Sequence, residues 1–171
     1  MQEKEYYRKL AAESRKEYLE AEAKSAEPGA SVPVIPVDVT IEVTVTYGSS
    51  TTTYPYKILE GRVTGQDKGR MPGAQDWIFD NVFEGSIEKN IISGVHKTHL
   101  VRNESDPKNC KTFIIDTKTN VKLTLHPDGS VTVSNLGGTS ENTGIGCPGG
   151  NTRNTGKVPA TTVQGRWRVV K

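Results

Sequence analysis

The sequence has no long apolar run, and it has few of the residues that build metal and redox sites. None of its hydrophobic stretches approaches the roughly 18 residues that a membrane-spanning helix needs, and its opening residues, MQEKEYYRKL, lack the apolar centre of a signal peptide. We therefore expect no membrane insertion. The sequence contains only three histidines. Of these, His96 and His99 are three apart on an expected strand and so point to opposite faces. Because zinc needs three or four suitably spaced ligands, we expect no metal site.

Neither sign of charge predominates, and the common catalytic motifs are missing. Lys and Arg number 22 against 20 Asp and Glu, and the basic residues are not grouped with aromatic ones. The sequence therefore predicts no nucleic-acid platform. It has no phosphate-binding loop, dinucleotide fingerprint, nucleophile elbow or zincin helix. We expect a non-catalytic protein without a cofactor, whose partners are carbohydrates or protein surfaces.

A proline-rich segment divides the chain. Residues 1–27 are rich in Ala, Glu, Lys, Leu and Arg, which predicts an N-terminal α-helix that acts either as an oligomer-forming stalk or as a cap. Residues 28–36 contain three prolines and predict an extended linker. Residues 37–171 form the predicted β domain.

The β domain is recognised by its alternation of apolar and polar residues. The segment VDVTIEVTVTY alternates without a break, and VKLTLHPDGSVTVSN predicts a hairpin whose turn uses the positive φ available to Gly129. The predicted strands cover residues 37–47, 56–63, 76–83, 90–102, 111–116, 121–126, 130–135 and 163–170. Short strands without interleaved helices predict an antiparallel β-barrel or β-sandwich of about eight strands, preceded by the helix.

The two cysteines lie at expected loop positions. Cys110 precedes a predicted strand, and Cys147 lies in a run of Gly, Asn, Thr and Ser. We predict a disulfide between them, because a free thiol in an exposed loop would be reactive. Two unrelated thiols or two metal ligands remain as alternatives. A disulfide favours an oxidising compartment, which makes the protein secreted or otherwise extracytoplasmic.

Two polar segments are candidates for ligand binding. Residues 136–162 are predicted to form a long loop, whose amides Asn142, Asn151 and Asn154 suit hydroxyl-rich ligands. A second predicted loop ends at Gln75, Asp76 and Trp77, which combine an aromatic ring with an amide and a carboxylate as sugar sites do. The alternatives are that Trp77 is a core residue and that the longer loop has no specific role.

The sequence thus favours a non-catalytic extracytoplasmic module that binds carbohydrate or another cell-surface ligand. Two other hypotheses remain open. In one, the barrel binds a small apolar molecule, as a carrier or as a cyclase or isomerase. In the other, the β domain is a structural or receptor-binding knob of an assembly held together by the N-terminal helix.

Overall fold

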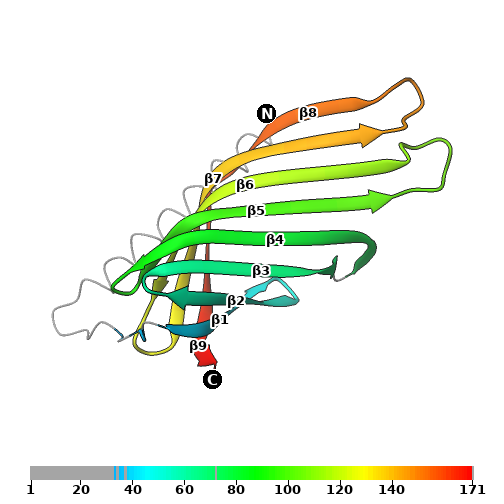
Figure 1. Cartoon of the computed structure of the whole chain (residues 1–171). Helices are drawn as coiled ribbons and strands as arrows, with labels where there is room; N and C mark the ends of the chain where they lie inside the picture. Colours follow the sequence, from blue (N-terminus) through cyan, green and yellow to red (C-terminus); the bar gives the residue numbers. More distant parts are fainter. Residues whose placement is uncertain (1–32, 34, 37, 72, 171) are drawn as a thin grey trace, which may run out of the picture.

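Nine antiparallel β-strands make up the described part of the chain, which comprises residues 33, 35–36, 38–71 and 73–170 of a computed structural model (Figure 1). The strands are β1 (Asp38–Tyr47), β2 (Ser50–Leu59), β3 (Arg62–Met71), β4 (Ala74–Glu88), β5 (Ile91–Asn103), β6 (Thr112–Leu125), β7 (Ser130–Ile145), β8 (Thr152–Val158) and β9 (Thr161–Val170). No helix occurs within these residues. The helix predicted within residues 1–27 lies outside them, as does most of the predicted linker.

Eight of the nine strands close a barrel. Each strand from β1 to β7 pairs with the next one along the chain, β9 joins β1 to β7, and β8 is an extra strand beside β7. The prediction of an antiparallel barrel or sandwich of about eight strands is therefore confirmed as a barrel. Alternating apolar side chains give each barrel strand one face to bury inside the barrel. On β1, Ile41, Val43 and Val45 are buried, while the residues between them face outward.

The interior of the barrel is filled by side chains. Its buried apolar residues come from every strand between β1 and β7, and Trp167 of β9 packs against them. They are Ile41, Val43, Val45, Tyr56, Ile58, Val63, Phe83, Ile92, Val121, Leu123, Leu125 and Val131. A small cavity next to Tyr56 and Phe83 has a volume of about 10 Å³, which is room for about one water molecule.

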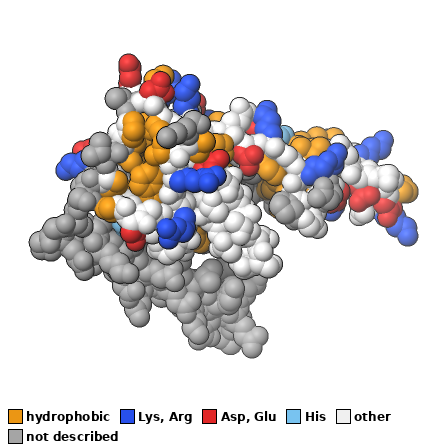
Figure 2. All heavy atoms as spheres, turned by 90° about the horizontal axis from the view of Figure 1, so that it is seen from below, with side chains coloured by type: hydrophobic (Ala, Val, Ile, Leu, Met, Phe, Trp, Pro, Cys, Tyr) orange, Lys and Arg blue, Asp and Glu red, His pale blue; other side chains and the backbone are white. Residues whose placement is uncertain are grey.

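The longest strands continue past the barrel as a single layer, which we call the arm (Figure 1). The arm comprises residues 66–71, 74–82, 97–103, 112–118, 139–145 and 152–157. It begins where β2 and β3 separate, since their pairing covers only Lys57–Leu59 and Arg62–Thr64. Pro55 of β2 lies just beyond the last pair, and proline is tolerated in a strand where no partner needs its missing N–H. Figure 2 shows the arm projecting from the body of the molecule, with charged side chains along it.

Strand β7 belongs to both the barrel and the arm. Its residues 130–135 pair with β9 and its residues 138–144 pair with β8, while β6 lies along its other edge throughout. The change of partner occurs at a bulge opposite Asn120, where Gly137 has a φ of 91° and donates its N–H to Asn135 Oδ1 at 2.9 Å. The extra residue reverses which side chains face inward, as bulges do. Beyond the bulge, Gly138 and every second residue after it lie on the face that continues the barrel interior.

The structure corrects three predictions of irregular structure. Residues 136–162 are not a long loop, because most of them belong to β7, β8 and the start of β9. The segment before Trp77 is the end of β3, a tight turn and the start of β4. Residues 117–120, which separate the predicted strands 111–116 and 121–126, lie inside the single strand β6. These stretches lack apolar alternation because, within the described residues, the arm has no second layer packed on it, so backbone pairing with neighbouring strands determines their conformation.

Two strand predictions fared differently. The hairpin is confirmed, with Leu125 paired to Val131 and with Gly129 at a φ of 81°. The strand predicted over residues 56–63 is wrong, because a turn at Glu60 and Gly61 divides it between β2 and β3. Both turn residues have a positive φ, which ends the extended conformation.

We expect Gly94→Ala to destabilise the barrel. An added Cβ at Gly94 would lie 2.6 Å from Phe83 Cζ and would collide with the carbonyl oxygen of Glu84. Overpacking of this kind costs roughly 1–3 kcal/mol of unfolding free energy, which urea denaturation would measure. Gly156→Ala is the matched control on the same sheet, since no heavy atom lies within 4 Å of its added Cβ. Equal effects of the two substitutions would contradict this account of Gly94.

Candidate functional site

A row of stacked side chains crosses the tip of the arm on the face that continues the barrel interior, here called the inner face. Trp77 of β4, Arg102 of β5 and Phe113 of β6 are direct partners in the strand register. Arg102 Cζ lies 5.1 Å from the centroid of the Trp77 ring and 4.9 Å from that of the Phe113 ring. Because a guanidinium group is attracted to both rings, the three side chains form a ladder that holds Arg102 in place.

Arg102 is only partly neutralised by its surroundings. Its nearest carboxylate is that of Asp76, with Oδ2 3.8 Å from Nε, which is too far for a hydrogen bond. The Nε atom is buried and has no hydrogen-bond partner in the described part of the chain. The side chain as a whole remains 27% exposed.

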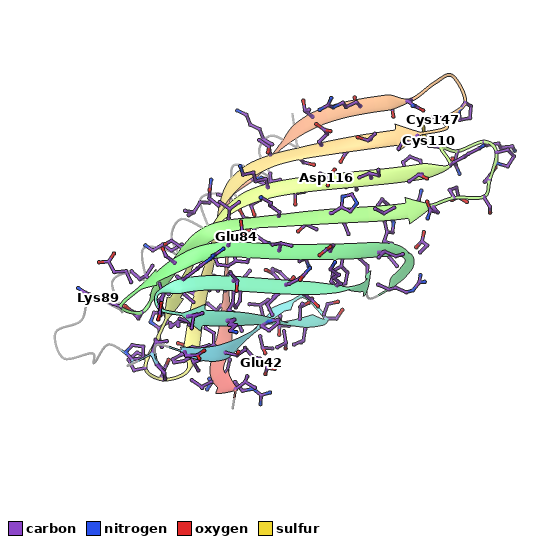
Figure 3. All side chains as sticks on the ribbon, in the orientation of Figure 1. Glu42, Glu84, Lys89, Cys110, Asp116 and Cys147 are labelled. Atoms are coloured by element: carbon purple, nitrogen blue, oxygen red, sulfur yellow. A yellow bond between two sulfur atoms is a disulfide. The ribbon has the colours of Figure 1, made fainter. Side chains whose placement is uncertain are left out.

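The disulfide lies next to the ladder, on the side of β7. Cys110 and Cys147 are bonded, which confirms the predicted pairing, and Figure 3 shows them at the tip of the arm. Both sulfur atoms lie 2.8 Å from the position that a Cβ on Gly144 would take. Gly144 is the partner of Phe113, so the absence of a side chain there makes room for the disulfide next to the ladder. This explains why a cysteine lies in a glycine-rich stretch.

The predicted amides do not all reach the inner face. Asn142 and Asn154 are direct partners on β7 and β8, are both exposed, and lie one row nearer the barrel than the ladder. Asn151 instead lies in the turn between these strands, where its Oδ1 accepts the N–H of Gly146 at 2.9 Å. Gln75 is on β4, directly before Asp76. The structure therefore brings Asp76, Trp77, Asn142 and Asn154 to one end of the arm.

Sequence analysis missed two members of the ladder. Arg102 and Phe113 are separated from Trp77 by 25 and 36 positions in the printed sequence, and only the registers of β4 with β5 and of β5 with β6 join them. A signal was present for Arg102, because the alternation in residues 90–102 places it on the same face as His96 and Leu100. Nothing in the sequence indicated that Phe113 would lie beside it.

The two histidines of β5 occupy opposite faces, as their spacing predicts. His96 lies on the inner face, edge-on to Tyr54, and burial lowers its pKa below the usual value. His99 lies on the outer face, with Nδ1 2.6 Å from Asp116 Oδ1. Among the residues that the structure describes, no three His, Cys, Asp or Glu side chains come together as a metal site.

Comparison with protein-family models, with curated proteins and with solved structures finds no match for this chain. In the described residues no helix is long and apolar enough to cross a membrane. Inference about function therefore depends on the geometry of the barrel and the arm.

Removing the disulfide should loosen the arm at its tip. We expect the double variant Cys110→Ser, Cys147→Ser to lose about 2–4 kcal/mol of unfolding free energy, because the bond closes a loop across 37 positions. Amide exchange of Thr112 and Ile145, the last pair of β6 and β7, should accelerate more than exchange in the barrel. Unchanged exchange at these two amides would show that the disulfide does not hold the arm together.

Proposed function

We propose that this protein is a non-catalytic binding module that holds a carbohydrate on the inner face of its arm. The observation that carries the proposal is the ladder of Trp77, Arg102 and Phe113. It lies outside the buried core of the barrel, on a single-layer sheet. The buried Nε of Arg102 has no acceptor among the residues that the structure describes. An unsatisfied buried donor is unfavourable for folding, and a role of Arg102 in binding would explain why it is kept.

The chemistry of the inner face suits a polyhydroxylated ligand. The rings of Trp77 and Phe113 offer apolar surface to the C–H groups of a sugar. Between them, Arg102 offers charged N–H donors for hydroxyl or carboxylate oxygens. Asn142 and Asn154 add amide donors and acceptors in the next row. The disulfide holds these strand ends together before the ligand arrives, which lowers the entropy cost of binding.

The barrel interior does not favour the hypothesis of a small-molecule carrier or isomerase. Ile41, Ile58, Ile92 and Leu123 are at most 1% exposed and fill the space that a ligand would need. An interior pocket for a drug-sized ligand has a volume of hundreds of Å³. The cavity next to Tyr56 offers only about 10 Å³.

We further propose an extracytoplasmic location. The disulfide between Cys110 and Cys147 supports it, because such bonds persist in oxidising compartments and are rare in the cytosol. Carbohydrates of cell surfaces and matrices are available in the same compartments.

Trp77→Ala should weaken glycan binding without unfolding the protein. We expect an affinity loss of at least about tenfold, equivalent to about 1.4 kcal/mol, because the ladder loses a ring and Arg102 loses its support. The measurement is binding of labelled protein to an array of neutral and uronate-containing glycans, with the melting temperature recorded in parallel.

Trp167→Ala is the matched control for that substitution. Trp167 packs against the barrel core, and its Nε1 donates to the carbonyl of His126 at 2.9 Å. We expect this variant to lose about 3–5 kcal/mol of stability while its folded fraction still binds glycan. Failure of the wild-type protein to bind any glycan, or full binding by the Trp77 variant, would overturn the proposal.

A second candidate function is assembly through the same face. Phe79, Leu100 and Ile115 are direct partners in the row beside the ladder, and they are only partly buried. An apolar sheet face is normally covered by another layer, and a second copy of the chain would supply one. The oligomerising helix predicted within residues 1–27 lies outside the described residues and stays a prediction.

Sedimentation velocity over a wide concentration range tests the assembly candidate. If copies associate through the inner face, Leu100→Glu should give monomers, because association would bury an unpaired charge. Val101→Glu places the same charge on the opposite face of the same strand and should leave the mass unchanged. A wild-type protein that is monomeric throughout would eliminate this candidate and leave the glycan proposal standing.

A further inference from the structure

The opposite face of the arm, here called the outer face, is hollowed into a groove with a volume of about 1030 Å³. The groove crosses the strands from β4 to β8. Its acidic and basic lining residues are Asp80, Glu84, Lys97, His99, Asp116, Lys118, Glu141 and Lys157. Two of these residues, Glu84 on β4 and Asp116 on β6, are labelled in Figure 3.

Every carboxylate in the groove has a basic side chain beside it. The pairs are Asp80 with Lys68 at 2.8 Å, Glu84 with Arg62 at 4.0 Å, Asp116 with His99 at 2.6 Å and Glu141 with Arg153 at 2.7 Å. The hydrogen bond from Lys68 is the main reason that the pKa of Asp80 lies below its usual value. Lysine or arginine side chains therefore offset the charge of Asp80, Glu84 and Glu141, while Asp116 is hydrogen-bonded to His99.

The three lysines of the groove have no such partners. Lys97, Lys118 and Lys157 form no ion pair within the residues that the structure describes. Lys97 and Lys118 also lie directly opposite each other on β5 and β6. Like charges directly opposite each other destabilise a sheet. Residues that are kept although they destabilise the fold are typical of functional sites.

The lysines follow one line across the arm. Lys118 is the partner of Thr139 on β7, which is in turn the partner of Lys157 on β8. Since neighbouring strands are about 4.8 Å apart, the backbones of Lys97 and Lys118 are separated by about 5 Å and those of Lys118 and Lys157 by about 10 Å. A chain that lies along this line meets three positive charges in succession.

We propose that the outer-face groove binds a linear anionic polysaccharide, whose sulfate or carboxylate groups pair with Lys97, Lys118 and Lys157. The hydroxyls of Thr139 and Thr155 line the same groove and add hydrogen bonds to sugar oxygens. Among the described residues that line the groove there is no Phe, Tyr or Trp on which nucleic-acid bases would stack, which favours a polysaccharide over a single-stranded nucleic acid. The proposal is independent of the inner-face site.

The probe for this proposal is size-defined dextran sulfate, with uncharged dextran as its neutral counterpart. We expect the wild-type protein to bind the sulfated polymer with an affinity that falls as salt rises, and not to bind dextran. The triple variant Lys97→Gln, Lys118→Gln, Lys157→Gln should bind at least about tenfold more weakly. By analogy with phosphate contacts, its slope of log affinity against log salt should be smaller by roughly two to three.

A second triple variant is the matched control. Lys57→Gln, Lys89→Gln, Lys108→Gln removes the same charge from exposed positions outside the groove and should bind dextran sulfate almost as the wild type does. Urea denaturation of both triple variants separates loss of binding from loss of folding.

Three results would overturn the proposal. One is no binding of dextran sulfate by the wild-type protein at low salt. Another is an equal loss in both triple variants, which would show that net charge alone attracts the polymer. The third is equally tight binding of single-stranded DNA of matched charge, which would remove the preference for a polysaccharide. Trp77→Ala should keep its dextran sulfate binding, so failure at one face is distinguishable from failure at the other.

Discussion

The whole architecture depends on how one strand, β7, is shared between the barrel and the arm. β7 pairs with β6 along its full length, but on its other edge it pairs first with β9 and then with β8. The bulge at Leu136 and Gly137 allows the exchange, because a positive φ at Gly137 bends the strand where the barrel ends. Before the bulge the chain closes a packed barrel, and after it the same hydrogen-bonded ladder continues into an open arm.

The arm gains cohesion from sources other than a buried core. Its strands are paired along their lengths, its tip is joined by the disulfide, and its inner face is bridged by the ladder around Arg102. Ion pairs on the outer face, such as Lys68 with Asp80, are exposed and contribute little individually. A single layer of this kind presents two chemically different faces: one carries aromatic rings and amides, and the other a lysine-lined groove. Each proposed ligand matches the charge and polarity of the face assigned to it.

Prediction from sequence succeeded where one face of a strand is buried. The alternation of residues 37–47 and the hairpin around Gly129 were predicted correctly, because the core imposes a period of two on these side chains. It failed over residues 136–162, where Thr, Asn and Gly face solvent on both sides of the sheet. There the backbone follows β6, a neighbour that composition does not reveal. The site was predicted in part: Trp77 and the disulfide were named, but Arg102 and Phe113 were not.

By itself, the sequence determined the β class and the inward-facing residues of the first strand and of the hairpin, since alternation is a property of the chain. It also favoured a disulfide between its two cysteines. Only the tertiary structure decided how the barrel closes through β9, and that Trp77, Arg102 and Phe113 meet in one row. It also decided that the carboxylates of the outer groove are paired, while Lys97, Lys118 and Lys157 form no ion pair with any other described residue. The physical reason is that strand order and register arise from contacts between segments far apart in the chain, whereas alternation is local.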